Sequence, residues 1–239
     1  MKKFDLILPV YNEVEIIEDV IDQLLQELTS DFYLLLGMTF NQIIIVEDGS
    51  NDGTSEILKS IGLSESSIKL LQYEVRLGYV AALNNATSYS SADYLMFCDS
   101  SGKYTVKDLR SLASKINDYD LVVGKRNTSN DVYYRFLLRK IMNKIVSRIC
   151  GVSITDIDSP VRIIKKSLID EINKFPRVEK YLYNLENTLI AIRELNSSYC
   201  EVEINYSERT NGKSRGIPAS RIPKVVFSAI KTIIFYRYK

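Results

Sequence analysis

The stretch IIIVEDGSNDGT, residues 43–54, joins a buried-strand pattern to a turn that is rich in carboxylates and glycines. The four consecutive β-branched residues at 43–46 predict a strand. Gly49 and Gly53 let the backbone turn sharply behind it. Because ligands of α/β proteins bind where the parallel strands end, Asp48 would stand at a binding edge. An acidic turn in front of a helix is the alternative interpretation, and the other segments decide between the two.

Strand and helix patterns alternate on both sides of this stretch. Apolar runs predict strands at residues 4–10, 68–73, 94–98 and 120–123, and helical spacing predicts helices at residues 13–28, 55–61, 78–89 and 106–116. This order predicts an α/β fold in which helices flank a mainly parallel central sheet. The alternation ends at residue 127, and we expect helices at residues 133–150, 167–175 and 182–195 and a strand at 199–206. No segment reads as a linker, so residues 1–215 are expected to form a single domain.

The composition excludes several classes of enzyme. The 239 residues include no histidine, which removes Ser-His-Asp hydrolysis, Cys-His proteolysis and most catalytic zinc sites. A general base would therefore be a carboxylate. The three cysteines lie far apart, and the N-terminus lacks the pattern of a secretory signal. We therefore expect a cytoplasmic protein.

The C-terminal end carries the positive charge of the chain. Residues 206–239 hold eight Lys or Arg residues and one acidic residue, a net charge of +7 that leaves −6 for residues 1–205. A solvated basic face is the simplest interpretation. A sharper one is a basic amphipathic helix within residues 216–239, which could lie on an anionic inner membrane surface without crossing the bilayer, or dock onto the domain's own core. The apolar side of this helix would hold Val225, Val226, Ala229, Ile230, Ile233 and Ile234, with Thr232 opposite.

Three of the predicted strands end in polar motifs. Strand one ends in LPVYNE at residues 8–13, strand two in EDGSNDGT at 47–54, and strand four in DSSGKY at 99–104. Parallel strands bring these ends to one edge of the sheet. An aromatic ring there can stack on a base, a carboxylate can accept from base or ribose donors, and a strand-end Asp can hold a cation bound to a diphosphate.

This set of motifs resembles the family 2 glycosyltransferases of GT-A fold. Their P-x-Y-N-E, D-D-G-S-x-D-G-T and D-x-D elements occur here in order, with Glu47 in place of the first Asp of the second element. Residues 76–84, 122–126, 156–162 and 209–215 are similar to later elements of the family. The last two bring the chain closest to the dolichyl-phosphate mannose synthase-like group. The resemblance implies a Rossmann-like nucleotide-binding half at residues 1–126 and an acceptor-side half at residues 127–215.

The resemblance also implies roles for individual residues. It places the nucleotide of a UDP- or GDP-linked sugar beside Pro9, Tyr11, Glu13, Asp48, Arg76, Gly78, Asp99 and Ser100. It assigns the catalytic side, which faces phosphate groups and the acceptor, to Arg126, Asp156, Asp158, Arg162, Arg209 and Lys213. Asp99 would face the diphosphate through Mg²⁺ or Mn²⁺.

The cation site departs from the family pattern D-x-D-x-Q. Asp99, Ser101 and Lys103 stand at its three positions, so a hydroxyl and an ammonium replace the second and third oxygen ligands. A hard cation can still bind through Asp99, diphosphate oxygens and water. Alternatively, Lys103 replaces the cation, because a positioned ammonium can also neutralise the leaving diphosphate. We therefore expect a reduced dependence on metal.

The expected reaction is transfer of a sugar from a nucleotide diphosphate donor, with the inversion that the resemblance implies. The acceptor is a polyprenyl phosphate, which needs no base, or a glycan hydroxyl, which needs a carboxylate. Asp156 or Asp158 is the candidate base, with Glu186 behind them. The alternative is a nucleotide-sugar-binding protein that has lost catalysis and acts as a partner or regulator. No nucleic-acid partner is expected, and a dinucleotide-binding dehydrogenase is disfavoured because no G-x-G-x-x-G follows the first strand.

Overall fold

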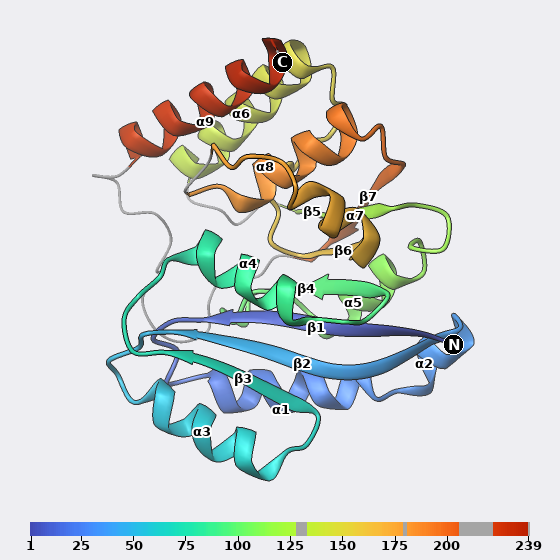
Figure 1. Ribbon diagram of the computed structural model, residues 1–239, viewed down its shortest axis with the longest axis vertical. Coiled ribbons are helices and arrows are strands. Elements are labelled where there is room, and N and C mark those ends of the chain that lie inside the picture. The colour runs from blue at the N-terminus through green and yellow to red at the C-terminus, as the bar shows by residue number, and fades with distance from the viewer. Residues whose placement is uncertain (128–132, 179–180, 206–221, 239) are drawn as a thin grey trace.

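The computed structural model describes residues 1–127, 133–178, 181–205 and 222–238. Within these ranges a seven-stranded sheet has the order β3-β2-β1-β4-β6-β5-β7 (Figure 1). The strands are β1 Lys2–Val10, β2 Met38–Asp48, β3 Ile68–Tyr73, β4 Tyr94–Phe97, β5 Leu121–Arg126, β6 Arg162–Lys165 and β7 Tyr199–Ile204. Strand β6 runs antiparallel to β4 and β5, and the other pairs are parallel. The predicted α/β fold with a mainly parallel sheet is confirmed.

Helices cover both faces of the sheet (Figure 1). The described helices are α1 Ile17–Leu28, α2 Asp31–Leu35, α3 Thr54–Ser64, α4 Tyr79–Tyr89, α5 Val106–Ala113, α6 Tyr133–Cys150, α7 Lys166–Ile172, α8 Tyr183–Leu189 and α9 Ile222–Tyr238. Alternate residues of β2 divide the core: Ile43 and Ile45 pack with α1, α3 and α5, whereas Ile44 and Val46 face the layer that contains α4, α7 and α8. Because both faces are covered, the strand is apolar throughout instead of alternating with polar residues.

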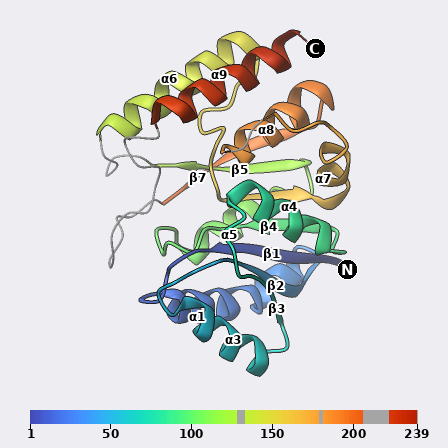
Figure 2. The same ribbon diagram turned by 60° about the vertical axis from the view of Figure 1, so that its left-hand side comes forward.

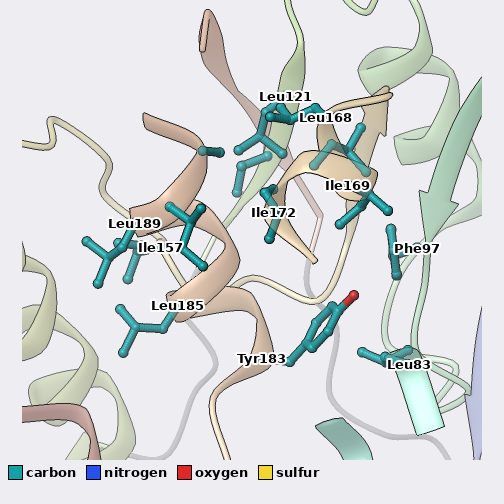
Figure 3. Packing of buried hydrophobic residues seen from close by; sticks show 14 of the residues in the cluster. Leu83, Phe97, Leu121, Ile157, Leu168, Ile169, Ile172, Tyr183, Leu185 and Leu189 are labelled. Carbon is teal, nitrogen blue, oxygen red and sulfur yellow. The ribbon is translucent and has the colours of Figure 1, made fainter. Parts of the chain in front are cut away.

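The second face of the sheet holds the core of the C-terminal half. Figure 3 shows Phe97 of β4 and Leu121 of β5 among side chains from α7 and α8, with Tyr183 below them. These contacts join strands of the N-terminal half to helices of the C-terminal half. The two halves therefore share one hydrophobic core.

The structure corrects several predicted boundaries. Strand β6 was not predicted, because four residues between a proline-containing turn and a helix carry little periodicity. Strand β2 begins at Met38 instead of residue 43, because its first residues pair with the start of β1. The helix expected at 182–195 ends as α8 at Leu189 and continues as a π-helical turn, Ile190–Glu194. Such departures depend on neighbouring strands and helices, not on local pattern.

Helix α9 lies within the range 216–239 expected for a C-terminal helix, of which residues 216–221 and 239 are outside the described residues, and one side of α9 packs against the rest of the chain. It lies beside α6 in both views, and Val225, Ala229, Ile233 and Tyr236 are buried (Figures 1 and 2). Thr232 was expected on the polar side but is also buried, and its hydroxyl donates to the Ser228 carbonyl at 3.0 Å. Docking onto the core is thus confirmed for this side, while Phe227, Ile230 and Ile234 remain exposed. Among the described helices, none combines the length and apolar character needed to cross a membrane.

Candidate functional site

The loops that follow β1 and β2 are fastened to each other. Asn12 has a left-handed backbone, φ 56°, and its amide N–H donates to the Ser50 hydroxyl at 2.9 Å. The Asn12 side chain donates to Asn51 Oδ1 at 3.0 Å and accepts from the Asn51 N–H at 2.9 Å. Glu13 N–H donates to the Thr54 hydroxyl at 2.8 Å. The polar residues of the two motifs therefore hold the loop backbones in place, which preorganises the edge of the sheet.

Glu47 occupies the position where the family has an Asp, and it is fully buried. Its Oε1 accepts the Ser50 N–H at 2.6 Å. A longer carboxylate at this position thus supports the turn that follows β2.

Asp48 connects this turn to the segment before α4. Its Oδ1 accepts the backbone N–H groups of Leu77 at 2.7 Å and Gly78 at 3.2 Å. Gly49 has φ 72°, and a Cβ added there would lie 2.9 Å from the Arg76 backbone nitrogen. Only a glycine fits such a close approach at this φ. The structure thus brings together the predicted nucleotide residues Asp48, Arg76 and Gly78.

Tyr11 provides a flat aromatic surface at the same edge. The Arg76 guanidinium carbon lies 3.9 Å from the centre of the Tyr11 ring, and the Arg76 side chain is 54% exposed. Arg76 also lies 3.7 Å from Asp48 through Nε and Oδ2. Stacking of this kind is the geometry by which an aromatic ring and an arginine receive a planar base. Pro9 lies on β1 two residues before Tyr11, is half-buried and is in register with Val46 of β2, and Glu13 is 8% exposed.

Asp99 follows β4 and folds back on its own loop. Its Oδ1 accepts from Ser101 twice, at 3.0 Å from the N–H and at 2.5 Å from the hydroxyl. Ser101 is therefore a donor to Asp99 in this structure, and the neighbouring Ser100 is buried. The described residues include no group of three His, Cys, Asp or Glu side chains that could hold a metal ion. The described residues therefore do not fit a metal site made of protein ligands alone. This loop offers a cation one carboxylate, Asp99, and Ser101 already donates to one of its two oxygens.

Arg126 and Asp156 form a two-point ion pair at the end of β5. Arg126 Nε donates to Oδ2 at 2.7 Å and Nη2 donates to Oδ1 at 2.6 Å, while the Arg126 N–H adds a contact of 3.1 Å to Oδ2. Burial works against the charge of Arg126, but the hydrogen bonds that Arg126 donates to Asp156 raise the pKa of Arg126 well above its ordinary value. Both carboxylate oxygens of Asp156 are thus engaged by one guanidinium. Asp156 is poorly placed to take a proton from an acceptor, because Arg126 occupies both of its oxygens.

Asp158 lies near the same arginine but is not tied to it by a hydrogen bond among the described contacts. Its Oδ1 accepts the Leu185 N–H at 3.3 Å, and the residue is half-buried. Burial raises the pKa of Asp158 to about 6, although the charges of Arg126 and Arg162 oppose the rise. A carboxylate with a pKa near neutrality is the kind of group that serves as a general base.

Arg162 is almost fully buried and faces the protein. Its Nε and Nη2 donate to the Ser159 carbonyl at 3.0 and 2.6 Å, and Nη1 donates to the Thr188 hydroxyl at 3.0 Å. Burial lowers the pKa of Arg162 to about 10, so the side chain stays protonated at neutral pH. Its hydrogen bonds hold the loop that carries Asp158 against α8. The expected contact of Arg162 with a phosphate is therefore replaced by contacts with protein carbonyls, because the side chain is only 2% exposed.

Tyr79 and Asn184 belong to the site and were not predicted. The Tyr79 hydroxyl lies 3.5 Å from Asn184 Nδ2. Tyr79 is 36% exposed, but burial of its hydroxyl, followed by the negative charges of Asp158 and Asp99, raises the pKa of Tyr79. Tyr79 thus lies near Asp99, which follows β4, and near Asp158, which lies in the loop before β6, and it contacts Asn184 of the C-terminal half. Its position beside Gly78 in the family-like run was a signal that could have found it, whereas no local pattern marks Asn184.

The structure does not support Glu186 as a second base. The side chain is fully buried, and its Oε1 accepts from the Val178 N–H at 2.7 Å and the Tyr236 hydroxyl at 3.1 Å. It joins α8 to α9 and serves the packing of the C-terminal helix. Arg209 and Lys213 lie outside the described residues.

Comparison with known proteins agrees with this geometry. Residues 5–173 match glycosyl transferase family 2. The fold is similar to glucosyl-3-phosphoglycerate synthase from Mycobacterium tuberculosis in complex with Mn²⁺, UDP and phosphoglyceric acid, with a TM-score of 0.73, 15% identity and coverage of 98% of this chain and 78% of that chain. It is also similar to a mannosyltransferase from Pyrobaculum calidifontis in complex with GDP-Man and Mn²⁺, with a TM-score of 0.68, 18% identity and coverage of 98% and 64%. At these identities the likeness shows the shared GT-A fold.

Proposed function

The chain belongs to glycosyl transferase family 2, and from this premise we propose that it transfers a sugar, with inversion, from a nucleotide diphosphate donor to an acceptor beside Asp158. The proposal combines the family with two clusters of side chains. One cluster gathers Tyr11, Arg76 and Asp48, and the other gathers Asp158 with Arg126. Tyr79 lies near both Asp158 and Asp99, the residue expected to face the diphosphate, because the negative charges of both carboxylates raise the pKa of Tyr79.

The observation that carries the proposal is the contrast between two neighbouring carboxylates. Asp156 is bound at both oxygens by Arg126, whereas Asp158 keeps a raised pKa of about 6. A general base works best when its pKa lies near the working pH, since it is then both ionised and basic. Of the two candidate bases, we therefore assign Asp158 to the removal of the proton from an acceptor hydroxyl.

Donor binding would use the first cluster. A uracil or guanine base would stack on Tyr11, and Arg76 would move aside or cover the base from its other face. Asp48 and Glu13 would accept from ribose or base donors. The diphosphate would face Asp99, where we propose that the positive charge of Lys103 reduces the need for a metal ion.

The acceptor is either a hydroxyl compound or a polyprenyl phosphate of the dolichyl-phosphate mannose synthase type. The raised pKa of Asp158 favours the hydroxyl, because a phosphate oxygen already carries negative charge and needs no base. The exposed Phe227, Ile230 and Ile234 of α9 are consistent with a lipid acceptor or an anionic membrane surface nearby. A nucleotide-sugar-binding protein without catalysis is the second candidate, and Ser101 and Lys103 in the cation motif favour it.

Transfer or hydrolysis of UDP- and GDP-linked sugars tests the proposal directly. We expect Asp158→Asn to lower kcat by about 10²- to 10⁴-fold, the usual contribution of a general base, without loss of UDP or GDP binding in a thermal-shift assay. Asp120→Asn is the matched control, because Asp120 pairs with Lys165 elsewhere on the sheet. A kcat of Asp158→Asn equal to that of the wild type would refute the assignment. Nucleotide binding without any turnover of the donor would instead support the second candidate.

A further inference from the structure

Asn184 is a buried amide whose side-chain oxygen has no hydrogen-bond partner among the described residues. The residue is 3% exposed, and its Oδ1 accepts nothing from that part of the chain. An unpaired buried carbonyl oxygen carries a desolvation penalty, so folded proteins keep few of them. A bound water molecule or a ligand normally completes such an atom. The unpaired oxygen therefore marks a place where a hydrogen-bond donor is expected.

The start of α8 holds Asn184 in this position. The main-chain carbonyl of Asn184 accepts from the Thr188 hydroxyl at 2.7 Å and from Arg162 Nη1 at 3.3 Å. The next residue, Leu185, donates its N–H to Asp158 Oδ1 at 3.3 Å and packs in the hydrophobic core (Figure 3). Because these contacts fasten the backbone on both sides, the helix cannot shift to give the amide a protein partner.

The Tyr79 hydroxyl, at the first residue of α4, is the neighbour of this amide. Asn184 Nδ2 donates to it at 3.5 Å, which is long for an N–H···O hydrogen bond. Burial and nearby carboxylates raise the pKa of Tyr79, so the hydroxyl keeps its proton at neutral pH. Within the described part of the chain, no acceptor binds this proton. The two side chains thus offer one acceptor, Asn184 Oδ1, beside one donor, the Tyr79 O–H.

One acceptor beside one donor suits a hydroxyl group, which donates one hydrogen bond and accepts others. A carboxylate or a diphosphate oxygen has no proton to give to Asn184 Oδ1. An ammonium cannot accept from Tyr79, and an apolar group would leave Oδ1 unpaired. The chemistry of this pair therefore favours a neutral hydroxyl compound.

The pair also lies between the two sides of the proposed reaction. The negative charges of Asp99, on the diphosphate side, and of Asp158, the proposed base, both act on the Tyr79 hydroxyl. A transferred sugar occupies the space between these groups, because the diphosphate leaves from the same carbon that the acceptor attacks. Gly78, which precedes Tyr79, donates its N–H to Asp48 Oδ2 at 3.1 Å and so joins Tyr79 to the nucleotide side.

We propose that Asn184 and Tyr79 bind one hydroxyl of the transferred sugar, and so select nucleotide sugars that carry this hydroxyl over their deoxy analogues. The inference rests on the proposed function, because the nucleotide must occupy the first cluster. The sugar hydroxyl donates to Asn184 Oδ1 and accepts from the Tyr79 O–H, and it takes the place of the long contact between the two side chains. Such a site rejects a ligand without the hydroxyl, because its own polar groups then stay unpaired.

Equilibrium binding of nucleotide sugars and their deoxy analogues tests the proposal. Isothermal titration calorimetry with UDP-glucose, UDP-galactose, UDP-N-acetylglucosamine and GDP-mannose identifies the ligand that binds most tightly, and the deoxy analogues of that ligand are titrated next. We expect one deoxy analogue to bind the wild type at least about tenfold more weakly than the parent. Asn184→Ala should abolish this difference by weakening the parent alone. Tyr79→Phe, which keeps the ring, should reduce it.

Asn187→Ala is the matched control. Asn187 is also 3% exposed and lies on α8, but its side-chain oxygen accepts from Arg177. The control should keep the wild-type difference between parent and deoxy analogue. Because it removes a paired amide, it should also lower the stability in urea unfolding more than Asn184→Ala does. Binding of UDP or GDP by each variant shows that the first cluster is intact.

Three results would overturn the proposal. In the first, every deoxy analogue binds the wild type as tightly as the parent, as expected if water alone completes Asn184 Oδ1. In the second, Asn184→Ala keeps the wild-type difference or Asn187→Ala loses it equally, and in the third none of the nucleotide sugars binds. Because these measurements need no turnover, the proposed function is judged separately. Sugar transfer without this selectivity would support the transferase and overturn the hydroxyl contact, and selectivity without transfer would do the reverse.

Discussion

Replacing Asp158 by Asn should make the protein more stable at neutral pH while it removes the proposed base. The pKa of Asp158 is about 6 in the folded protein and has an ordinary value of 3.8. This difference of about two units corresponds to about 3 kcal/mol at about 1.4 kcal/mol per unit. Because Asp158 is only half-buried, water screens part of this cost, and we expect about 1–3 kcal/mol.

The sign follows from which state binds the proton more tightly. The folded state has the higher pKa, so it is favoured by protonation, and the contribution of Asp158 to stability is fully present below about pH 4. It is lost as the pH rises through about 6. Asn cannot ionise, and it can still accept the Leu185 N–H. The stability of Asp158→Asn relative to the wild type should therefore increase between about pH 4 and pH 7.

Urea unfolding of both proteins across this pH range measures the effect. The difference in free energy of unfolding, not its absolute value, isolates Asp158 from the other titrating groups. Asp120→Asn should instead show a nearly constant difference across this range, because the hydrogen bond from Lys165 lowers the pKa of Asp120 and its contribution to stability is lost only as the pH falls below about 4. A stability difference for Asp158→Asn that does not change with pH, or that decreases as the pH rises, would refute the account of this carboxylate.

Three further predictions concern the nucleotide side. Gly49→Ala should destabilise the protein by about 1–3 kcal/mol more than Gly37→Ala in urea unfolding. Both glycines have positive φ, but of the two only Gly49 would bring an added Cβ within 4 Å of other backbone atoms, so equal losses of stability would contradict the close approach. Tyr11→Ala should weaken UDP or GDP binding by about 5- to 150-fold in calorimetry, the loss of about 1–3 kcal/mol of base stacking, whereas Tyr11→Phe keeps the ring and should bind as the wild type does. Transferase activity should persist in EDTA, and it should fall at least about tenfold in Lys103→Gln. The opposite result would be loss of activity in EDTA that Mn²⁺ restores, together with an unchanged rate for Lys103→Gln. It would show that a metal ion, and not the lysine, neutralises the diphosphate.

Much of the nucleotide side could be predicted from sequence because its residues follow strands in short, continuous motifs. The strand at residues 43–46 and the turn behind it gave the position of Asp48, and parallel pairing of β1 with β2 then fixed Tyr11 nearby. The reason for Glu47 needed the structure, since only the fold shows that its carboxylate supports the turn at Ser50.

The acceptor side was harder to predict because it is assembled from segments that are distant in the sequence. Asp156 and Asp158 are two residues apart, and no local pattern distinguishes them. Their contacts in the folded protein differ, because Arg126 binds Asp156 whereas the Leu185 N–H donates to Asp158. Arg162 has the residue type of a phosphate ligand, yet the fold directs it to carbonyl groups.

The sequence by itself determined the alternation of strands and helices, the family and the place of the nucleotide motifs. These depend on periodicity and on turn residues, which act within a few positions of the chain. The tertiary structure decided that β6 enters the sheet between β4 and β5, that α9 packs on α6, and that Arg126 binds Asp156 while burial raises the pKa of Asp158. Those outcomes depend on burial and on pairing between residues far apart in sequence, because desolvation and a neighbouring charge set what a carboxylate can do.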